Sequence, residues 1–431
     1  MNAGRIVNAR LLPSPTDTVN PPLIPLPGRF AISWSNGAIE RVAPQPDGTI
    51  SADDNVIDAA GALLLPALVD AHLHPDLAFS RETVLPNRSG TLAEAISHWA
   101  AAKRELTPDG VHERARRCFD AEWRGGTGTI RAHVDVGSAA GLRLLEGVAA
   151  AAAEFRDRIR IQIVAFPQDG LIRDPEAEAN LRAAMRAGCT LVGGIPHVER
   201  SPADSRAHLK IVFDVAAEHN AEIDVHVDET DDPNSRCTEM LTELTIERGW
   251  QGRVTASHVC ALASYPEEYA RRVIARVAEA RIRVVTNPGV NLHLQGRGDG
   301  YPRRRGLTRV RDLLDAGVPC AAGQDCIRDP FYPIGNGRLL DQAFLLVHAE
   351  HMDSDRRMRT ALEMVTGMAA DVVGAGAQRV AVGEPADLAL FAVGDAVQLL
   401  SDRPAPMLVV HAGCIAVGAS TGVPAVVTLR S

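Results

Sequence analysis

Short apolar segments alternate with segments of helical spacing through the middle of the chain. Residues 90–104 place Leu92, Ile96 and Trp99 at helical spacing, whereas the apolar run that begins at Leu63 is typical of a buried strand. The predicted strands are 63–76, 130–136, 161–167, 190–196, 222–228, 253–258, 282–287 and 318–323. The predicted helices are 90–104, 141–156, 175–187, 206–219, 267–280 and 310–315. Regular β/α alternation closes most readily into a parallel barrel, so we expect a (β/α)8 barrel.

Both ends of the chain have a different pattern, with short β-like runs separated by Gly and Pro. Near the N-terminus, Asn36-Gly37 is a strong signal for a tight turn between two such runs. Similar runs occur at 386–391, 407–411 and 414–417. Neither end is long enough to form a core alone. We therefore expect a TIM-like barrel over residues 65–375 and a small β-sandwich domain formed by residues 1–64 together with 376–431.

The charge balance argues against nucleic acid and anionic membranes as partners. The chain has 45 basic and 54 acidic side chains, and hence a formal net charge of −9. We interpret the basic run 297–305 as a lid or a brace of the site rather than an RNA-binding loop, because it follows a strand end. The sequence has neither a bilayer-spanning apolar segment nor a signal-peptide pattern, so we expect a cytoplasmic protein.

Cysteine and lysine usage narrows the chemistry. Seven cysteines are scattered without C-x-x-C spacing, which indicates reduced thiols rather than a disulfide framework or a zinc ribbon. Lysine occurs only as Lys103 and Lys210, so arginine carries nearly all positive charge.

Side chains able to bind a metal or move protons gather where the predicted strands end, which is the face of a parallel barrel that carries chemistry. His72 and His74 close the first strand. Residues i and i+2 of a strand point to the same side, so these two imidazoles can bind one ion. The later strands end at or near His133 with Asp135, Gln168, His197, His226 with Glu229, His258, Asn287 and Asp325. For His133 and His197, a place in the site and a role as hydrogen-bonded neighbours both stay open.

Five local phrases, in one order, carry a resemblance to a known family. They are Ile-Val-Ala-Phe-Pro-Gln at 163–168, Ile-Asp-Val-His-Val-Asp-Glu at 223–229, Val-Thr-Ala-Ser-His at 254–258, Asn-Pro-Gly-Val-Asn-Leu-His-Leu-Gln-Gly-Arg at 287–297 and Asp-Pro-Phe-Tyr-Pro at 329–333. With the opening His-x-His, this order resembles the amidohydrolase superfamily and, within it, the cytosine deaminase family. The similarity runs from about residue 65 to residue 335.

The resemblance implies a catalytic metal site made of His72, His74, His226 and Asp325. Superfamily members with two ions usually bridge them with a carboxylated lysine, or sometimes a glutamate, at the end of the fourth strand. Here the fourth strand contains no lysine, and Glu199 is the only nearby carboxylate. One divalent ion is therefore favoured. Three imidazoles and a carboxylate suit Zn²⁺ or Fe²⁺, and the sequence does not separate the two.

The same resemblance assigns catalytic roles around a flat nitrogenous ring. It implies that Asp325 takes the proton of the attacking water, that His258 orients the hydroxide, and that Glu229 protonates the ring nitrogen. Strict strand alternation would place Asp228, rather than Glu229, on the side of His226. Asp228 therefore stays the alternative acid.

The residues expected to contact the substrate are Gln168, Cys326 and Phe331. The Gln168 amide has both a donor and an acceptor and suits a ring carbonyl beside an N–H. Cytosine deaminases typically have His, Asp and Asp after the eighth strand and Trp where Phe331 stands, whereas this chain has Gln324, Asp325 and Cys326. These exchanges remove charge and bulk. We therefore expect a nucleobase-like substrate, either cytosine or a 5-substituted cytosine such as 5-methylcytosine.

Other functions remain open at this level. The site could deaminate another aminated heterocycle, such as isoguanine, creatinine or an aminotriazine. It could also hydrolyse a cyclic amide, although such relatives usually need two bridged ions. A metal-binding barrel without activity would be signalled by loss of ligands, and all four are present. The helix-rich segment 337–374 could cover the barrel or meet a second copy in a homo-oligomer.

Overall fold

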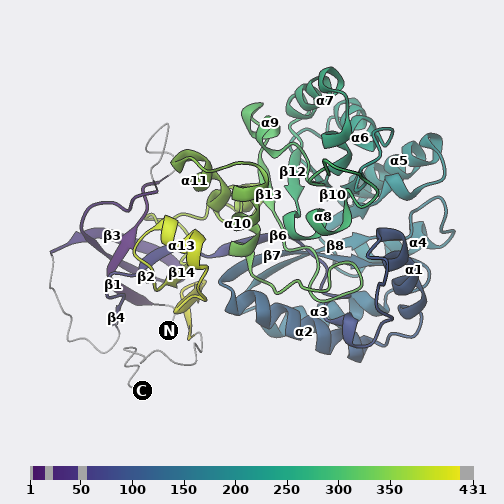
Figure 1. Cartoon of the computed structure of the whole chain (residues 1–431). Helices are drawn as coiled ribbons and strands as arrows, with labels where there is room; N and C mark the ends of the chain where they lie inside the picture. Colours follow the sequence, from purple (N-terminus) through teal and green to yellow (C-terminus); the bar gives the residue numbers. More distant parts are fainter. Residues whose placement is uncertain (1–2, 15–22, 47–55, 418–431) are drawn as a thin grey trace.

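Eight parallel strands form a barrel in the computed structural model, which describes residues 3–14, 23–46 and 56–417 (Figure 1). Each strand pairs with the next in chain order: β6 (Leu68–Leu73), β7 (Thr127–Asp135), β8 (Arg160–Phe166), β9 (Leu191–Gly194), β10 (Glu222–Val227), β11 (Val254–His258), β12 (Arg283–Thr286) and β13 (Cys320–Ala322). A parallel bridge between Leu73 and Asp325 joins β6 to the segment after β13, and the amide of His74 donates to the Asp325 carbonyl over 2.8 Å. The predicted barrel is confirmed, and its last seam lies at residues predicted to bind metal.

Helices surround the barrel (Figure 1). They are α1 (Leu92–Ala102), α2 (Pro108–Arg124), α3 (Arg143–Phe155), α4 (Ala177–Arg186), α5 (Pro202–His219), α6 (Cys237–Glu247), α7 (Glu267–Glu279), α8 (Pro288–Leu294), α9 (Val310–Asp315), α10 (Leu339–Ala349), α11 (Asp355–Glu363) and α12 (Gly367–Val372). Short 3-10 turns lie at Ser80–Glu82, Pro196–Val198 and Cys260–Ser264. Within the described part of the chain, no helix is both long and apolar enough to cross a bilayer.

Besides the short helix α8, the sequence prediction of the barrel missed α2 and α6. A capping signal marks the start of α2, where the Thr107 side chain accepts a hydrogen bond from the Gly110 amide and Pro108 takes the first helical position. α6 is rich in threonine, which has a low helix propensity. The Thr242 and Thr245 hydroxyls donate to carbonyls four residues earlier, over 2.7 Å each. Tertiary packing therefore overrides the local preference of α6.

Strands from both ends of the chain share one mixed sheet beside the barrel (Figure 1). Its strands are β1 (Gly4–Leu11), β2 (Arg29–Ser35), β3 (Ala38–Gln45), β4 (Val56–Asp58), β5 (Leu63–Pro66), β14 (Leu388–Phe391), β15 (Leu408–His411) and β16 (Cys414–Val417), and α13 (Ala396–Asp402) joins β14 to β15. β5 pairs antiparallel with β14. The predicted hairpin forms at Asn36 and Gly37, whose φ values are 50° and 79°. Residues 1–2, 15–22, 47–55 and 418–431, which the small-domain prediction also includes, lie outside the described residues.

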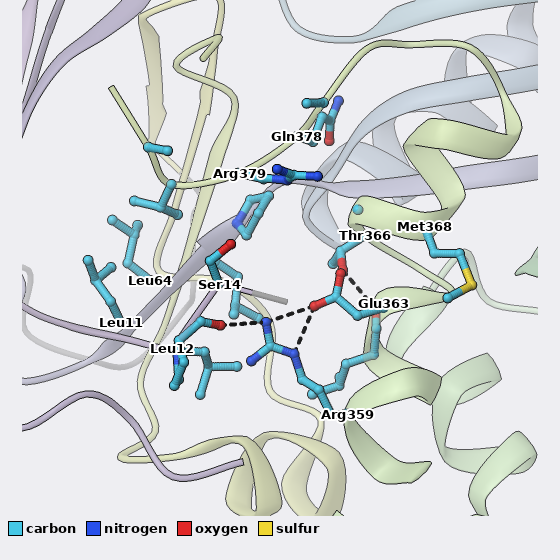
Figure 2. A pocket seen from close by; sticks show the side chains of 18 of the residues that line it. Leu11, Leu12, Ser14, Leu64, Arg359, Glu363, Thr366, Met368, Gln378 and Arg379 are labelled. Atoms are coloured by element: carbon cyan, nitrogen blue, oxygen red, sulfur yellow. Dashed lines mark hydrogen bonds and ion pairs between the residues drawn. The ribbon is translucent and has the colours of Figure 1, made fainter. Parts of the chain in front are cut away.

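A cavity of about 210 Å³ lies between this sheet and the helices α11 and α12. Leu11 and Leu64 contribute apolar walls. Figure 2 shows the Arg359 guanidinium beside the Glu363 carboxylate, to which its Nε donates over 2.8 Å. Arg359 also donates to the carbonyl of Pro13 over 3.1 Å. Arg359 and Glu363 therefore pair with each other, and Arg359 joins α11 to the segment that follows β1.

Candidate active site

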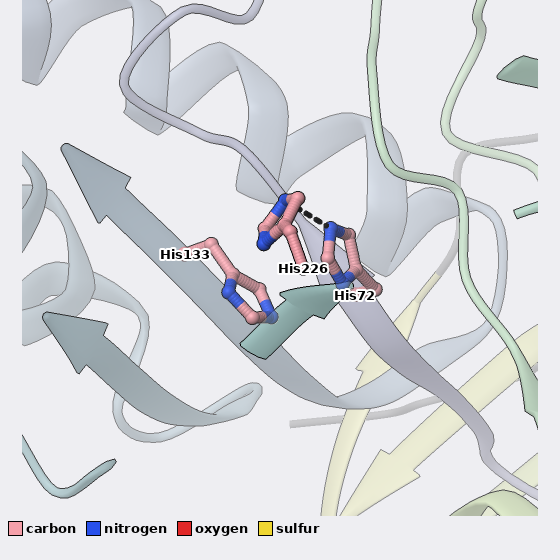
Figure 3. A group of neighbouring side chains, drawn as sticks. All are labelled: His72, His133 and His226. Carbon is pink, nitrogen blue, oxygen red and sulfur yellow. Dashed lines mark hydrogen bonds between the residues drawn. The ribbon is translucent and has the colours of Figure 1, made fainter. Parts of the chain in front are cut away.

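Three imidazoles from opposite sides of the barrel point their Nε2 atoms at one another. His72 lies in β6, His74 follows it, and His226 lies in β10. The Nε2 atoms are 3.3 Å apart between His72 and His74, 3.1 Å between His72 and His226, and 3.0 Å between His74 and His226. Figure 3 shows the rings of His72 and His226 turned toward each other. Nitrogens bound about 2.0–2.1 Å from a common divalent ion lie at such separations, so the three rings fit a metal site.

These imidazoles are buried and neutral. Burial lowers the pKa of His74 to about 3, and burial with neighbouring imidazoles holds the pKa values of His72 and His226 well below the usual range. Nδ1 of His72 lies 3.1 Å from Oγ of Ser257, which donates its own proton to Asp224 over 2.8 Å. His72 therefore carries its proton on Nδ1, and its Nε2 lone pair faces the other two rings.

Asp325 brings a carboxylate to the same cluster. Its Oδ1 lies 3.8 Å from Nε2 of His72 and 3.6 Å from Nε2 of His74. Its Oδ2 is buried and has no hydrogen-bond partner among the described residues. Burial raises the pKa of Asp325 well above its ordinary value. A buried carboxylate oxygen without a protein partner is suited to a cation or to a reacting water molecule.

His258 is held in one orientation by an asparagine. The side-chain oxygen of Asn291 accepts a hydrogen bond from the backbone amide of Asn287 over 3.2 Å. The side-chain NH2 group of Asn291 therefore faces Nδ1 of His258, at 2.9 Å. Nδ1 is thus an acceptor, and the proton of the neutral ring lies on Nε2. Nε2 lies 3.8 Å from Oδ2 of Asp325. Burial keeps the pKa of His258 well below the usual range, so the ring offers an N–H without a charge.

Glu229, rather than Asp228, lies in the wall of the central cavity. Asp228 has a φ of 51°, which ends the strand alternation after β10. Its carboxylate accepts from the amides of Cys237 and Thr238, over 2.9 and 2.8 Å, at the start of α6. Oε1 of Glu229 lies 3.6 Å from Nδ1 of His258, and burial raises the pKa of Glu229 to about 8. Glu229 therefore holds a proton at neutral pH.

The cavity beside these groups has a volume of about 40 Å³. Its polar wall includes Glu229, His258 and Asp325, and Cys326 and Phe331 lie in the same wall. The Cys326 thiol is 3.5 Å from Oδ1 of Asp325. The rest of the wall is mainly apolar, with Leu77, Leu92, Ile96, Phe166, Ile195, Val198 and Val290. The structure thus brings all the predicted site residues to one cavity or to the imidazole cluster beside it.

Gln168 also lines this cavity, but one side of its amide is already engaged. Its Oε1 accepts a hydrogen bond from Nε1 of Trp99 over 2.8 Å. Trp99 was not predicted as a site residue, because its helical spacing marks it equally well as a core residue. The contacts of His72 with the Ser257 hydroxyl and of His258 with the Asn291 amide were also missed, because no spacing along the chain marks them.

His133 and His197 occupy different places. The His133 ring stacks on that of His72, with centroids 4.0 Å apart and planes inclined by 28° (Figure 3). Two groups of side chains have possible ligand atoms that lie within 4.8 Å of one another. His72 forms one group with His133 and His226, and the other with His258 and Asp325. The His133 ring, however, lies against the face of the His72 ring, whereas His74 and His226 point Nε2 at Nε2 of His72. His133 therefore fits a supporting position, while His197 lines the cavity.

Glu199 does not reach the metal cluster. Its carboxylate lies 2.7 Å from Nδ1 of His208 and accepts from the backbone amides of residues 171, 172 and 173. Lys210 is exposed on α5. Neither residue is placed to bridge two ions.

The basic run 297–305 makes contacts within the protein. Arg304 donates to Asp299 over 2.8 Å and to the carbonyl of Asp231 over 2.6 Å. Arg305 lies 2.7 Å from the His351 ring. These contacts brace the run against the loop after β10 and the end of α10.

Comparison with known proteins gives consistent matches over most of the chain. A sequence model of the amidohydrolase family matches residues 55–414. The pterin deaminase of Rhizobium rhizogenes is 31% identical over 393 residues, which cover 88% of this chain and 86% of that protein. The N-isopropylammelide isopropyl amidohydrolase of Pseudomonas sp. is 30% identical over 362 residues, covering 82% and 85%. The structure of 5-methylcytosine deaminase from Klebsiella pneumoniae, liganded with 5-fluorocytosine, is 33% identical with a TM-score of 0.88, covering 95% of this chain and 96% of that chain.

Proposed function

The chain belongs to the amidohydrolase family and is a hydrolase acting on carbon–nitrogen bonds, and we propose that it deaminates an amino-pyrimidine base, cytosine or a 5-substituted cytosine such as 5-methylcytosine. One observation carries this proposal: a cluster of metal-binding imidazoles, a buried carboxyl group at Glu229 and the amide of Gln168 border the same small cavity. The similarity to a 5-methylcytosine deaminase supports the choice of base.

The proposed cofactor is one divalent ion, Zn²⁺ or Fe²⁺, with His72, His74, His226 and Asp325 as its ligands. Such an ion lowers the pKa of a water molecule to near neutrality and so supplies hydroxide for attack on the ring. The proposal of one ion, rather than two, is supported by the engagement of Glu199 with His208.

Asp325 and His258 would handle the attacking water. Oδ2 of Asp325 accepts one proton of the water while the oxygen adds to the ring carbon that carries the amine. The Nε2–H of His258, 3.8 Å from that oxygen of Asp325, orients the hydroxyl group by hydrogen bonding. Because His258 is neutral, it directs the oxygen without competing for the proton.

Glu229 and Gln168 would handle the ring. Glu229 donates its proton to the ring nitrogen next to the attacked carbon, and Gln168 binds the ring carbonyl. As the adduct collapses, Asp325 returns its proton to the departing amine and Glu229 regains one from the new hydroxyl group. Ammonia leaves, a carbonyl forms, and both carboxyl groups return to their starting states.

The uncharged wall formed by Cys326 and Phe331 supports the proposal that the substrate ring carries a small apolar substituent. A thiol and a phenyl ring present no charge to a methyl group. The wall on this side of the cavity contains Cys326 and Phe331 together with Leu77 and Val290. The second candidate is an aminated triazine, which is also a single ring and is supported by the relative named as an N-isopropylammelide hydrolase.

Ammonia release from a panel of heterocycles tests the proposal. The panel contains cytosine, 5-methylcytosine, isoguanine, creatinine, pterin and N-isopropylammelide. For N-isopropylammelide, the release of the alkylamine is measured in place of ammonia. The highest kcat/KM is expected for 5-methylcytosine or cytosine. A strong preference for plain cytosine removes the 5-substituent hypothesis, and turnover of pterin or the triazine alone overturns the pyrimidine assignment.

A further inference from the structure

The amide of Gln168 has a defined orientation. Trp99, on α1, is fully buried, and its Nε1–H donates to Oε1 of Gln168 over 2.8 Å. An indole nitrogen is a donor only, so turning the amide around would oppose two donors. The oxygen therefore stays with Trp99. The NH2 group of Gln168 is the part left to meet a ligand in the cavity that this residue lines.

Lys103 holds the backbone next to Gln168. It lies four residues after Trp99 and therefore on the same side of the helix. Its buried Nζ is 2.6 Å from Oδ2 of Asp135, at the end of β7, and 2.5 Å from Oδ2 of Asp169, which directly follows Gln168. A buried ammonium group paired with two carboxylates resists displacement, because each charge left unpaired would be costly.

The same helix also forms the outer wall of the cavity. Leu92 and Ile96 of α1 line it. A second cleft, with a volume of about 350 Å³, shares Ile96, Gln168 and Val198 with the cavity. Gln168 thus lies between the outer cleft and the inner cavity, where an entering ring would meet its NH2 group.

We propose that Trp99 and Lys103 are positioning residues that present Gln168 purely as a hydrogen-bond donor, so that the site selects heterocycles with a ring carbonyl at this position and rejects rings with an amino group there. This inference rests on the proposed function and deepens it, since it defines the substrate class by one acceptor atom. It also separates 2-oxo-pyrimidines from diamino rings of nearly the same size.

Binding of two inert rings tests the inference without turnover. Calorimetry of the metal-loaded full-length protein would compare pyrimidin-2-one with 2-aminopyrimidine. Neither ring carries an amine at position 4, which is the amine that the proposed reaction removes from cytosine. We expect the wild type to prefer pyrimidin-2-one by about tenfold or more, as one well-placed hydrogen bond allows. Trp99→Phe keeps an aromatic ring but frees the amide, so the preference should fall below about threefold.

Matched variants separate positioning from general packing. Trp250→Phe removes an indole N–H that has no acceptor in the part of the chain that the structure describes, and should leave the preference unchanged. Gln168→Leu should abolish the preference, and adding Trp99→Phe to it should change nothing further. Asp169→Asn removes one partner of Lys103 while Asp135 remains, so a smaller loss, of about twofold to threefold, is expected even if Lys103→Met does not fold.

Three results would overturn the inference: equal or unmeasurable binding of both rings by the wild type, a full preference in Trp99→Phe, or an equal loss of affinity for both rings in that variant. The last result would mean that Trp99 only supports packing. If the wild type shows the expected preference but releases no ammonia from any cytosine, the proposed function fails while this inference stands.

Discussion

Two cavities of this protein differ in a way that separates function from size. The cavity between the terminal sheet and α11 has a volume of about 210 Å³, and the one at the carboxyl ends of the barrel strands about 40 Å³. Each contains a glutamate, half-buried in the larger cavity and buried in the smaller one. In the larger cavity Glu363 is paired with Arg359 at 2.8 Å, whereas in the smaller one Glu229 has no cationic partner among the residues that the structure describes and lies 3.6 Å from a neutral imidazole.

The difference teaches that buried carboxyl groups without a cationic partner, rather than volume, mark the site. In the larger cavity, Arg359 donates to the Glu363 carboxylate and the Pro13 carbonyl, so its charge is paired although its Nη1 has no hydrogen-bond partner within the described residues. In the smaller cavity, Oδ2 of Asp325 and Nδ1 of His74 have no hydrogen-bond partner within the described residues. Folding leaves such groups buried at a cost, which a bound ion and substrate can offset.

Metal removal should have the largest effect on activity, because the expected ion lies beside the smaller cavity and not the larger one. Dialysis against a chelator removes the ion that the three imidazoles are expected to hold, so ammonia release should fall below detection. One equivalent of Zn²⁺ or Fe²⁺ per chain should restore it, as measured by metal analysis with activity. A requirement for two equivalents would contradict the one-ion site and favour the cyclic amide alternative.

Neutralising the two glutamates should give opposite outcomes. Glu229→Gln removes the proposed acid, so kcat should fall by about two to four powers of ten with unchanged or slightly higher stability. Glu363→Gln, the matched variant, leaves kcat unchanged but lowers the free energy of unfolding by about 1–3 kcal/mol, because Arg359 loses a charged partner. Steady-state kinetics and urea unfolding measure the two effects. Loss of activity in both variants, or in neither, would contradict the assignment of catalysis to the smaller cavity alone.

Filling the smaller cavity should change the choice of substrate. Phe331→Trp enlarges the wall that is expected to face the ring substituent, so the ratio of kcat/KM for 5-methylcytosine to that for cytosine should fall by about ten- to two-hundredfold. Ala377→Leu adds bulk to the larger cavity and should leave this ratio unchanged. An unaltered ratio in Phe331→Trp would place the substituent elsewhere.

The pH dependence should report Glu229. Burial raises its pKa to about 8, so the acid form dominates at neutral pH and is lost as the pH rises through that value. Because the proposed step needs the proton, kcat/KM should decline about tenfold per pH unit above pH 8. The stopped ammonia assay between pH 6 and 10 checks this. In Glu229→Gln the residual activity should lack this decline, and a wild-type profile that stays flat to pH 10 would exclude Glu229 as the acid.

Local patterns predicted much of the fold and the metal cluster. The period of two along the first strand places His72 and His74 on one side, and the same logic marks the ends of the other strands. The order of the phrases between residues 163 and 333 added the family, and hence Glu229 and Gln168. Helices α2 and α6 were not predicted, because α2 is highly charged and α6 is rich in threonine.

By itself the sequence determined the barrel and its terminal sheet, because strand period and β/α alternation are written in neighbouring residues, and its resemblance to a known family implied the candidate ligands. Only the tertiary structure decided which side chains meet. Asp228 turns away because its φ is 51°, a local feature that the strand period cannot encode. The proton on His72 is set by Ser257, 185 residues away, and the orientation of Gln168 by Trp99, 69 residues away. Such contacts depend on distances in space between strand ends and loops, and no spacing along the chain specifies them.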